Sequence, residues 1–322
     1  MPFRRHADNP ILSSRDLPYS ANSVFNAAAV ELEGDTLLLL RVEDQCGFSH
    51  LTLARSRDGF RNWRIAEEPT LPSDPTNHPE ELWGIEDPRI TRMENGDEEA
   101  DEEGDLFAIV YTAFSACGPL VSLATTRDFL DFTRWGSILP PEDKDAALFP
   151  ARFGGRYAMI HRPVPAMPNM GAHMWISFSP DLKHWGDHQI LLSARSGGWW
   201  DANKIGLSPP PLRTEEGWLI MYHGVRDTAA GSLYRVGLAL LDLHDPTRVL
   251  RRSDEWILGP QASYERQGDV PGVVFPCGWV QRDGELRVYY GAADTTVAVV
   301  TADMEEVMAW LHRHSRAEGE AR

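Results

Sequence analysis

A short turn pattern recurs along the chain, and it constrains the fold more than any other feature of the sequence. In each copy the end of an apolar run is followed by an aspartate turn and then, in the clearer copies, by an aromatic residue. The aspartates of successive copies are 70, 53, 64 and 58 residues apart, and they are Asp58, Asp128, Asp181, Asp245 and Asp303. The fourth copy is weaker, and the fifth leads into a helix. A repeat of this length is typical of one four-stranded β-sheet per unit.

The segments between these turns have the composition of short β-strands. They are rich in valine, isoleucine, leucine and aromatic residues, and Gly, Pro, Asn or Asp separates them. We expect strands at 36–42, 107–113, 120–126, 157–161, 174–178, 218–223, 235–241, 286–290 and 297–301. One helix is expected near the C-terminus, where Asp303 and Glu306 form a capping box. Its apolar side chains share one face and are Met304, Val307, Met308 and Leu311.

Five units of about 64 residues each account for the 322 residues of the chain. The predicted fold is therefore all-β, a five-bladed β-propeller with a short C-terminal helix, and a single domain covers residues 1–322. An acidic surface loop at 94–105 and a frayed tail at 315–322 are expected within it. A two-sheet sandwich is the alternative fold, but it does not explain five copies of the turn. A propeller assembles its sites from several blades, so candidate site residues are expected to be far apart in the sequence.

Almost half of the net charge of −17 comes from one segment. Between Glu94 and Asp105 the chain has eight acidic residues and no basic one, and strand-like runs flank this segment. We interpret it as a solvated hairpin tip rather than a cation site, because the ligand spacing of an EF-hand is absent. A chain this acidic is a poor binder of nucleic acid or of an anionic membrane.

Other features of the sequence argue against a membrane protein, a disulfide-stabilised protein and a metalloprotein. The sequence has no run of about 18 apolar residues and no apolar signal core, so we expect a cytoplasmic protein without a membrane span. The three cysteines, Cys46, Cys117 and Cys277, are far apart, which predicts reduced thiols rather than a disulfide framework or a zinc site. The histidines show no metal-binding spacing, so no metal site is predicted.

Four basic or protonatable residues interrupt or end strand-like runs. Arg41 directly follows four leucines, Arg162 and His223 end further runs, and Lys204 lies among Trp and Gly residues. Each residue alone is most simply a satisfied structural group, as Arg41 would be if it paired with Glu43. As a converging set in an acidic protein they predict an anion site, and phosphate is the common case.

Two adjacent carboxylates, Glu86 and Asp87, precede Pro88. Strand alternation would put them on opposite faces, so only one of the two needs to enter the central funnel. The alternative is that Asp87 caps its own turn, as is common before proline. Flat apolar rings that suit the C–H face of a sugar are supplied by Trp83, Trp199, Trp200 and Tyr222, although core packing explains most of the 11 tryptophans.

Segments in order along nearly the whole chain resemble glycoside hydrolase family 130, the β-mannoside phosphorylases and related mannosidases. They read NSVFN at 22–26, LRVED at 40–44, GIEDPR at 84–89, KDAALFP at 144–150, HRP at 161–163, DANKIG at 201–206, GWLIMYHG at 217–224, GDVP at 268–271, FPC at 275–277 and YYGAAD at 289–294. The family fold is a five-bladed β-propeller, in agreement with the repeat count. The segments RVEDQCGFSHLTLA at 41–54 and GWWDANK at 198–204 look most like the β-1,2-mannobiose and oligomannan phosphorylases.

The resemblance implies inverting phosphorolysis of a β-mannoside, which gives α-mannose 1-phosphate and a shortened acceptor. Asp87 occupies the position of the general acid, which is thought to protonate the glycosidic oxygen through the mannose 3-hydroxyl. No cofactor is implied, because inorganic phosphate is a co-substrate and is already a nucleophile. A homo-oligomer is expected, since family members often assemble.

The resemblance also implies binding residues. Some relatives have an arginine directly after Phe149-Pro150, and Arg152 lies one position beyond it in this chain. The residues that would hold the phosphate are Arg41, Arg152, Arg162, Lys204, Tyr222 and His223. The β-manno-oligosaccharide would be held by hydrogen bonds and by stacking on indole rings, from Asn22, Ser23, Asp145, Asp269, Asp294, Trp199 and Trp200. His223 would bind phosphate best when protonated.

Three alternatives stay open. The chain could be a β-1,4-mannoside phosphorylase, because β-1,4-specific relatives share the core segments. It could be an inverting β-mannosidase of the same family, with Asp201 or Glu43 as the base. A non-catalytic carbohydrate-binding propeller is the third alternative, and the presence of Asp87 together with the basic set argues against it.

Overall fold

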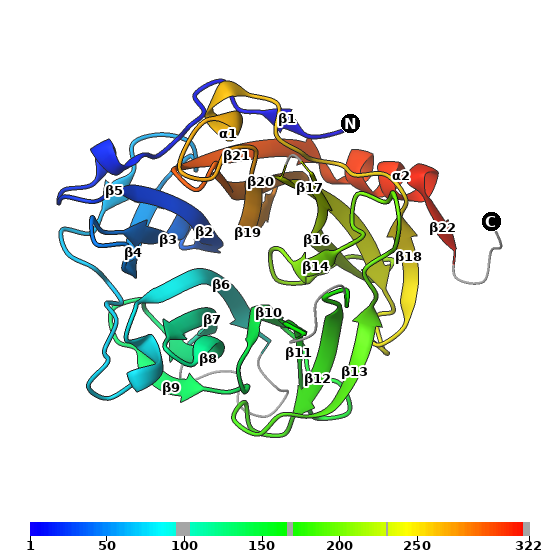
Figure 1. Ribbon diagram of the computed structural model, residues 1–322, viewed down its shortest axis with the longest axis horizontal. Coiled ribbons are helices and arrows are strands. Elements are labelled where there is room, and N and C mark those ends of the chain that lie inside the picture. The colour runs from blue at the N-terminus through cyan, green and yellow to red at the C-terminus, as the bar shows by residue number, and fades with distance from the viewer. Residues whose placement is uncertain (95–103, 166–169, 230, 318–322) are drawn as a thin grey trace.

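A ring of five antiparallel β-sheets surrounds one central axis in the computed structural model, which describes residues 1–94, 104–165, 170–229 and 231–317 (Figure 1). The predicted five-bladed β-propeller is therefore confirmed. One strand of each sheet lies nearest the axis, and these innermost strands are β2 (Ser23–Leu32), β6 (Ile85–Met93), β10 (Asp143–Leu148), β14 (Lys204–Leu207) and β19 (Val274–Arg282).

The strands of each blade follow one another outward from the axis. Blade one continues with β3 (Asp35–Glu43), β4 (Ser49–Ser56) and β5 (Arg64–Ile65); blade two with β7 (Leu106–Ser115), β8 (Gly118–Thr126) and β9 (Thr133–Ser137); blade three with β11 (Tyr157–Pro163), β12 (Met174–Ser179) and β13 (Gly186–Leu192). Blade four continues with β16 (Trp218–Thr228), β17 (Gly231–Leu241) and β18 (Val249–Ser253), and blade five with β20 (Glu285–Ala292) and β21 (Thr296–Asp303). All nine strands expected from the sequence are among these.

The N-terminus closes the ring. Strand β1 (Arg4–Arg5) pairs antiparallel with β21, so the first strand of the chain is the outermost strand of the last blade. Arg5 also donates from Nε to Glu265 Oε1 at 2.7 Å and from Nη2 to Glu265 Oε2 at 2.9 Å. Glu265 is fully buried in the short helix α1 (Ser263–Arg266), so this ion pair fixes the start of the chain to the loop before β19.

The repeated turn lies at the same place in every blade, at the end of the third strand. Asp58 Oδ1 accepts hydrogen bonds from the backbone N–H groups two and three residues ahead, and Asp128, Asp181 and Asp303 do the same. In blade four the residue with this pattern is Asp242, not the predicted Asp245. The sequence assigned the wrong one of two nearby aspartates because both precede turn-forming residues.

The C-terminal helix α2 (Met304–His314) follows the fifth turn and is confirmed, with Asp303 as its N-cap. Residues 315–317 were expected in a frayed tail, but they form strand β22 (Ser315–Ala317), which pairs with the outer edge of β18. An open strand edge has unpaired backbone groups, and β22 satisfies them. Residues 318–322 lie outside the described residues.

An apolar cluster fills the space between each pair of neighbouring blades. Leu39 and Phe107 share the cluster between blades one and two, and Ile160 and Tyr222 share the cluster between blades three and four. The acidic segment connects β6 to β7, as predicted, although its residues 95–103 lie outside the described residues. Among the helices of the described residues, none is long and apolar enough to cross a membrane.

Minor elements complete the chain. Two 3₁₀-helices, η1 (Ser14–Asp16) and η2 (Pro79–Glu81), lie before β2 and β6, and β15 (Leu212–Arg213) pairs with β16. Because the innermost strands all begin at the same end of the ring, their first residues face one another there. The candidate site is built at this end.

Candidate active site

Three of the innermost strands carry the same irregularity near their first residues. The pairing register shifts between Phe25 and Ala28 in β2, between Glu86 and Arg89 in β6, and between Lys144 and Ala147 in β10. Within these bulges lie three non-glycine residues with left-handed backbone conformation, at φ of 46°, 48° and 53°: Asn26, Asp87 and Asp145. A bulge redirects a side chain that regular pleating would send elsewhere, and such strained residues cluster at functional sites.

Asp87 lies at the centre of a first group of polar side chains, which we call the acid side: Asn26, Arg41, Glu86, Asp87 and Asp294. Asp87 Oδ1 accepts from Asn26 Nδ2 at 2.8 Å and from Arg41 Nη1 at 2.9 Å. Its side chain is 9% exposed. Arg41 also donates from Nη2 to Glu86 Oε1 at 3.0 Å and from Nε to Ser49 Oγ at 3.0 Å, so its guanidinium holds blades one and two together.

The predicted separation of Glu86 and Asp87 onto opposite faces is wrong. Both carboxylates contact the same Arg41 guanidinium. The bulge at this position breaks the two-residue alternation on which that expectation rested.

The acid side carries more negative than positive charge, and the pKa values of its carboxyl groups diverge. Burial opposes ionisation of Asp87, but the charges of Arg41, Lys144 and Arg89 prevail and lower its pKa. Burial, together with Asp87, raises the pKa of Asp294 to about 7, and burial also raises the pKa of Glu86. Neighbouring carboxylates whose pKa values are pushed apart are typical of acid–base sites.

A second group, which we call the basic side, consists of Asp145, Arg162, Lys204 and His223. Arg162 donates from Nε and Nη2 to Asp145 Oδ2 at 2.8 and 2.7 Å, and His223 Nε2 lies 3.3 Å from the same oxygen. Although burial opposes ionisation of Asp145, Arg162 and His223 hold its pKa well below the usual range. Asp145 is 2% exposed, and this placement favours an anchor for the basic residues over the predicted contact with mannose.

Lys204 is the first residue of β14, and its ammonium lies 5.7 Å from the ring centroid of Tyr234. Burial and the nearby Arg162 lower its pKa, which Asp145 partly opposes. Asp145 and His223 can approach β14 closely only because residue 206 is glycine. A Cβ at this position would lie 2.2 Å from Asp145 Oδ2 and 2.6 Å from His223 Cε1. A cation that is destabilised by its neighbours gains most from an incoming anion.

His223 was expected to bind phosphate best in its protonated form, but its surroundings in the structure disfavour that form. It is 2% exposed and packs against Phe275 at a ring separation of 4.6 Å. Burial lowers its pKa despite the attraction of Asp145, so the neutral imidazole prevails at neutral pH. It contributes a hydrogen-bonding nitrogen rather than a charge.

Arg89 connects the two sides. It is 1% exposed and donates from Nη1 to the carbonyl oxygen of Asp87 at 3.1 Å, while its Nη2 lies 3.6 Å from Asp145 Oδ1. It also donates to the carbonyl oxygens of Leu207 and Ser208 in blade four. Arg89 and Asn26 were not assigned a role from the sequence, although both stand in segments that carry the family resemblance. Their adjacency to bulged carboxylates is visible only in three dimensions.

Three predicted sugar-binding residues lie at the rim of the acid side. Asn22 donates from Nδ2 to Asp269 Oδ2 at 3.1 Å and to Glu43 Oε1 at 3.3 Å, and Asn22 and Asp269 are exposed. Ser23 is fully buried, and its hydroxyl has no hydrogen-bond partner among the described residues. The structure therefore gathers Asn22 and Asp269 at one edge and leaves Ser23 beneath them.

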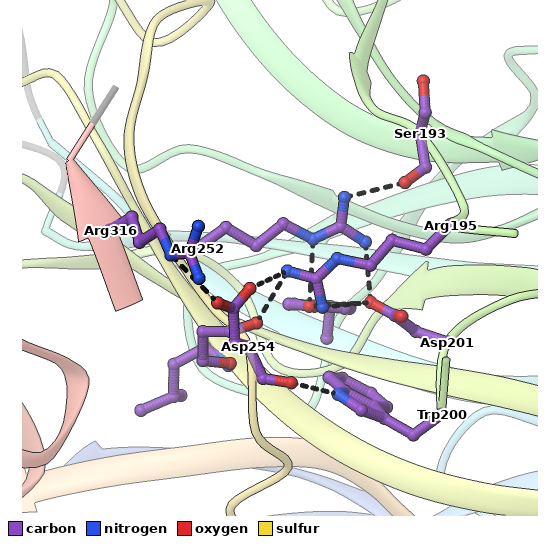
Figure 2. A network of polar contacts seen from close by, with 10 residues as sticks. Ser193, Arg195, Trp200, Asp201, Arg252, Asp254 and Arg316 are labelled. Carbon is purple, nitrogen blue, oxygen red and sulfur yellow. Dashed lines mark hydrogen bonds and ion pairs between the residues drawn. The ribbon is translucent and has the colours of Figure 1, made fainter. Parts of the chain in front are cut away.

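Tyr222 does not reach the basic side. It is adjacent to His223 in β16 and points to the opposite face, where its hydroxyl donates to Asp201 Oδ2 at 3.1 Å. Figure 2 shows the network in which Asp201 lies, with Arg252 at 2.7 Å and Arg195 at 3.3 Å from the same carboxylate oxygen. The structure therefore does not bring Tyr222 to the basic side, because strand alternation sends neighbouring residues to different faces.

Trp199 and Trp200 also lie on this opposite face of blade four. The Trp200 ring stacks on Tyr222 at 5.4 Å and its Nε1 donates to the carbonyl oxygen of Asp254 at 3.0 Å (Figure 2). The Trp199 ring lies 4.2 Å from the guanidinium carbon of Arg195. The structure does not bring either indole to the acid or basic side, contrary to the expectation that both bind the substrate there.

Arg152 is likewise separated from the basic side. It lies in the turn between the end of β10 and the start of β11, whereas Asp145 stands near the beginning of β10. Its side chain is exposed, donates to the Tyr157 hydroxyl and covers the Tyr157 ring. The structure does not bring Arg152 to the other predicted phosphate-binding residues, because the length of β10 separates it from Asp145.

Comparisons with known proteins identify the family of this chain. The model of glycoside hydrolase family 130, described as β-1,4-mannooligosaccharide phosphorylase, matches residues 5–313. The chain therefore belongs to glycoside hydrolase family 130. It is 34% identical to the 1,2-β-oligomannan phosphorylase of Thermoanaerobacter sp. (strain X514), over 95% of this chain and 98% of that relative.

Two further similar proteins are named for different mannoside linkages, β-1,4 and β-1,2. The chain is 34% identical to the β-1,4-mannooligosaccharide phosphorylase of Ruminococcus albus, over 97% of this chain and 91% of that relative. The solved structure of β-1,2-mannobiose phosphorylase from Listeria innocua, in complex with β-1,2-mannobiose, superimposes with a TM-score of 0.85 at 31% identity, over 98% of this chain and 100% of that chain.

Proposed function

We propose that this protein catalyses the inverting phosphorolysis of β-mannosides, giving α-mannose 1-phosphate and a shortened acceptor. One observation carries the proposal: near the axis of the ring lie a buried carboxyl group, Asp87, and a separate group of phosphate-binding residue types. Arg89 ties the two sides together. Inverting substitution needs a nucleophile and an acid on opposite faces of the sugar, and this arrangement supplies both.

Phosphate would bind at the basic side. Lys204 contributes an ammonium, Arg162 a guanidinium fixed by Asp145, and His223 a ring nitrogen beside the same carboxylate. Fixed donors of this kind hold phosphate in line with the anomeric carbon, which lowers the entropic part of the barrier. Arg41, expected in the phosphate set, instead belongs to the acid side by its contacts with Asp87 and Glu86.

Asp87 would donate the proton that the departing glycosidic oxygen takes up. Arg41 and Asn26 orient its carboxyl group. Because Arg41, Lys144 and Arg89 lower the pKa of Asp87 against the effect of burial, this pKa must rise before the group acts as an acid. A phosphate dianion bound nearby has this effect, since a like charge disfavours the ionised carboxylate. The phosphate oxygen then bonds to the anomeric carbon while the bond to the glycosidic oxygen breaks.

Hydrolysis by the same site is disfavoured by the lack of a suitable base among the candidates. Asp201 lies on the other face of blade four, bound by Arg195, Arg252 and Tyr222. Glu43 lies on the same side as Asp87, 3.8 Å from Arg41. An inverting hydrolase needs its base across the sugar from the acid, and neither residue occupies such a position.

The preferred linkage in the proposal is β-1,2. It is supported by the segments at 41–54 and 198–204 and by the relatives whose names specify β-1,2-mannosides. The family description and the Ruminococcus relative make β-1,4-phosphorolysis the second candidate. Phosphate serves as co-substrate, and the proposed reaction needs no further cofactor. Homo-oligomerisation and a cytoplasmic location stay predictions from the amino-acid sequence.

The test is an incubation of the purified protein with β-1,2- or β-1,4-mannobiose, each with and without inorganic phosphate. We expect α-mannose 1-phosphate only in the presence of phosphate, and faster release from β-1,2-mannobiose. Equal release of free mannose with and without phosphate would identify a hydrolase. Binding of mannobiose without any turnover would identify a non-catalytic propeller.

A further inference from the structure

A pocket of about 590 Å³ lies beside the outer strand of blade four, apart from the acid and basic sides. Three tryptophans and two carboxylates line it, together with Met1 and Gly198; they are Trp199, Trp200, Asp254, Glu255 and Trp256. Tyr222, on which Trp200 stacks, faces away from His223, so the sheet of blade four separates this pocket from the basic side.

The three indole rings are held in place before any ligand binds. Trp200 is fixed by its hydrogen bond to the Asp254 carbonyl and by stacking on Tyr222 (Figure 2). The Trp199 ring lies against the guanidinium of Arg195 at 4.2 Å, and the Trp256 ring lies 4.9 Å from the guanidinium carbon of Arg235. Rings that are already ordered lose little conformational entropy on binding, which favours affinity for a flat ligand face.

The two carboxylates that line the pocket already have polar partners. Asp254 pairs with Arg195 at 3.0 Å and with Arg316 at 3.6 Å, and Glu255 Oε1 lies 3.3 Å from His314 Nδ1. A charged ligand would therefore have to displace an existing partner. A neutral ligand with hydroxyl groups can instead share the carboxylate oxygens and place its C–H face on an indole.

We propose that this pocket is a second carbohydrate-binding site, which takes a neutral oligosaccharide. That the oligosaccharide is a β-mannoside rests on the proposed function; the ring and charge geometry alone specify a neutral sugar. In this proposal Trp199 and Trp200 contact a sugar outside the catalytic funnel, whereas the sequence predicted a contact with the substrate inside it. The site adds a point of attachment for chains longer than the disaccharide that is cleaved.

The test is titration calorimetry of the Asp87→Asn variant with β-1,2-mannotriose and β-1,4-mannotriose, without phosphate. We expect two binding sites per chain for one of these sugars. Trp256→Ala in the same background should weaken the second site by about tenfold or more, because it removes one stacking face. Trp256→Phe, which keeps a ring, should restore part of the affinity, and Trp185→Ala, in the distant turn of blade three, should leave both sites intact.

Activity and mass measurements complete the test. In the otherwise native chain, Trp256→Ala should leave the phosphorolysis of mannobiose unchanged. A single binding site that Trp256→Ala does not affect would overturn the second site. So would a change of molar mass by light scattering in Trp256→Ala, which would identify the pocket as a contact between copies of the chain. Failure of the native protein to form α-mannose 1-phosphate would count against the proposed function alone, because calorimetry reads binding without turnover.

Discussion

The acid side and the basic side use the same backbone device in different electrostatic surroundings, although the pKa of the bulged aspartate is lowered in both. Asp87 and Asp145 stand at equivalent bulges of neighbouring blades, both with positive φ and both buried. Asp87 shares one arginine with Glu86 and lies near Asp294, so negative charge accumulates around it. Asp145 is enclosed by Arg162, Arg89 and His223, so its charge is neutralised by its neighbours. The neighbours of a carboxylate, rather than its residue type or position, set its chemistry.

The largest effect is expected when the carboxyl group of the acid side is removed. Asp87→Asn keeps the shape of the side chain but cannot donate the proton, and we expect kcat to fall by at least about a hundredfold. Steady-state phosphorolysis measures this change, and thermal unfolding checks that the fold is intact. The matched control is Asp283→Asn in the exposed turn before β20, where the side chain is 96% exposed. Retention of most of the activity would remove Asp87 from the role of acid.

On the basic side, Lys204→Ala should mainly weaken phosphate binding. A hydrogen bond from a charged donor contributes about 1.5–3 kcal/mol, so the KM for phosphate should rise by about tenfold to a hundredfold. The KM for the mannoside should change little, because that sugar meets the acid side. Lys183→Ala, a surface variant whose ammonium contacts two backbone carbonyls, serves as control. A mannoside KM that rises together with the phosphate KM would mean that the two sides are not separate binding regions.

The excess negative charge of the acid side should appear in the pH dependence of stability. The pKa of Asp294 is raised to about 7 by burial and by Asp87, whereas an unfolded chain ionises this group near pH 4. The unfolded chain therefore loses its proton first as the pH rises from about 4 to 7, and stability falls over this window. Asp294→Asn should raise the Tm by about 2 °C or more at pH 8, and by less at pH 5. A gain that is equal at both pH values would contradict the raised pKa.

The smallest effect is expected for Tyr222→Phe, which tests the boundary of the basic side. The structure places this hydroxyl on Asp201 and Arg252, so we expect no change in the KM for phosphate. Loss of the buried hydrogen bonds should lower the free energy of unfolding by about 1 kcal/mol in urea denaturation. A tenfold rise of the phosphate KM would place Tyr222 at the phosphate after all.

Much of the fold follows from local patterns. The aspartate turn is a local hydrogen-bond motif, so its repetition predicted five blades, and β-strand composition predicted nine strands. Basic residues of the first two strands of the blades were also identifiable, because an Arg or His that ends an apolar run needs a partner. Arg41, Arg162, Lys204 and His223 are indeed brought to the axis, although they divide between two sides.

The expectations that differ from the structure concern residues whose side-chain direction depends on one local feature of a strand. The bulge at Asp87 put Glu86 on the same arginine, and the regular strand at His223 turned Tyr222 away from the site. Neither bulge nor face is encoded in composition, because both depend on the register between neighbouring strands. Arg152 was expected beside the other basic residues, but the length of β10 separates it from Asp145.

The pairing of β1 with β21 has a consequence for synthesis of the chain on the ribosome. Arg4 pairs with Thr301, so β1 stays unpaired until β21 has been synthesised. Contacts of such large sequence separation form late and slowly. Blades one to three are composed of consecutive hairpins, whereas blade four also takes up β22, and the last blade and the loop held by Arg5 and Glu265 need the pairing of β1 with β21. The rim residue Asp269 lies in that loop, so the site becomes complete at the very end of folding.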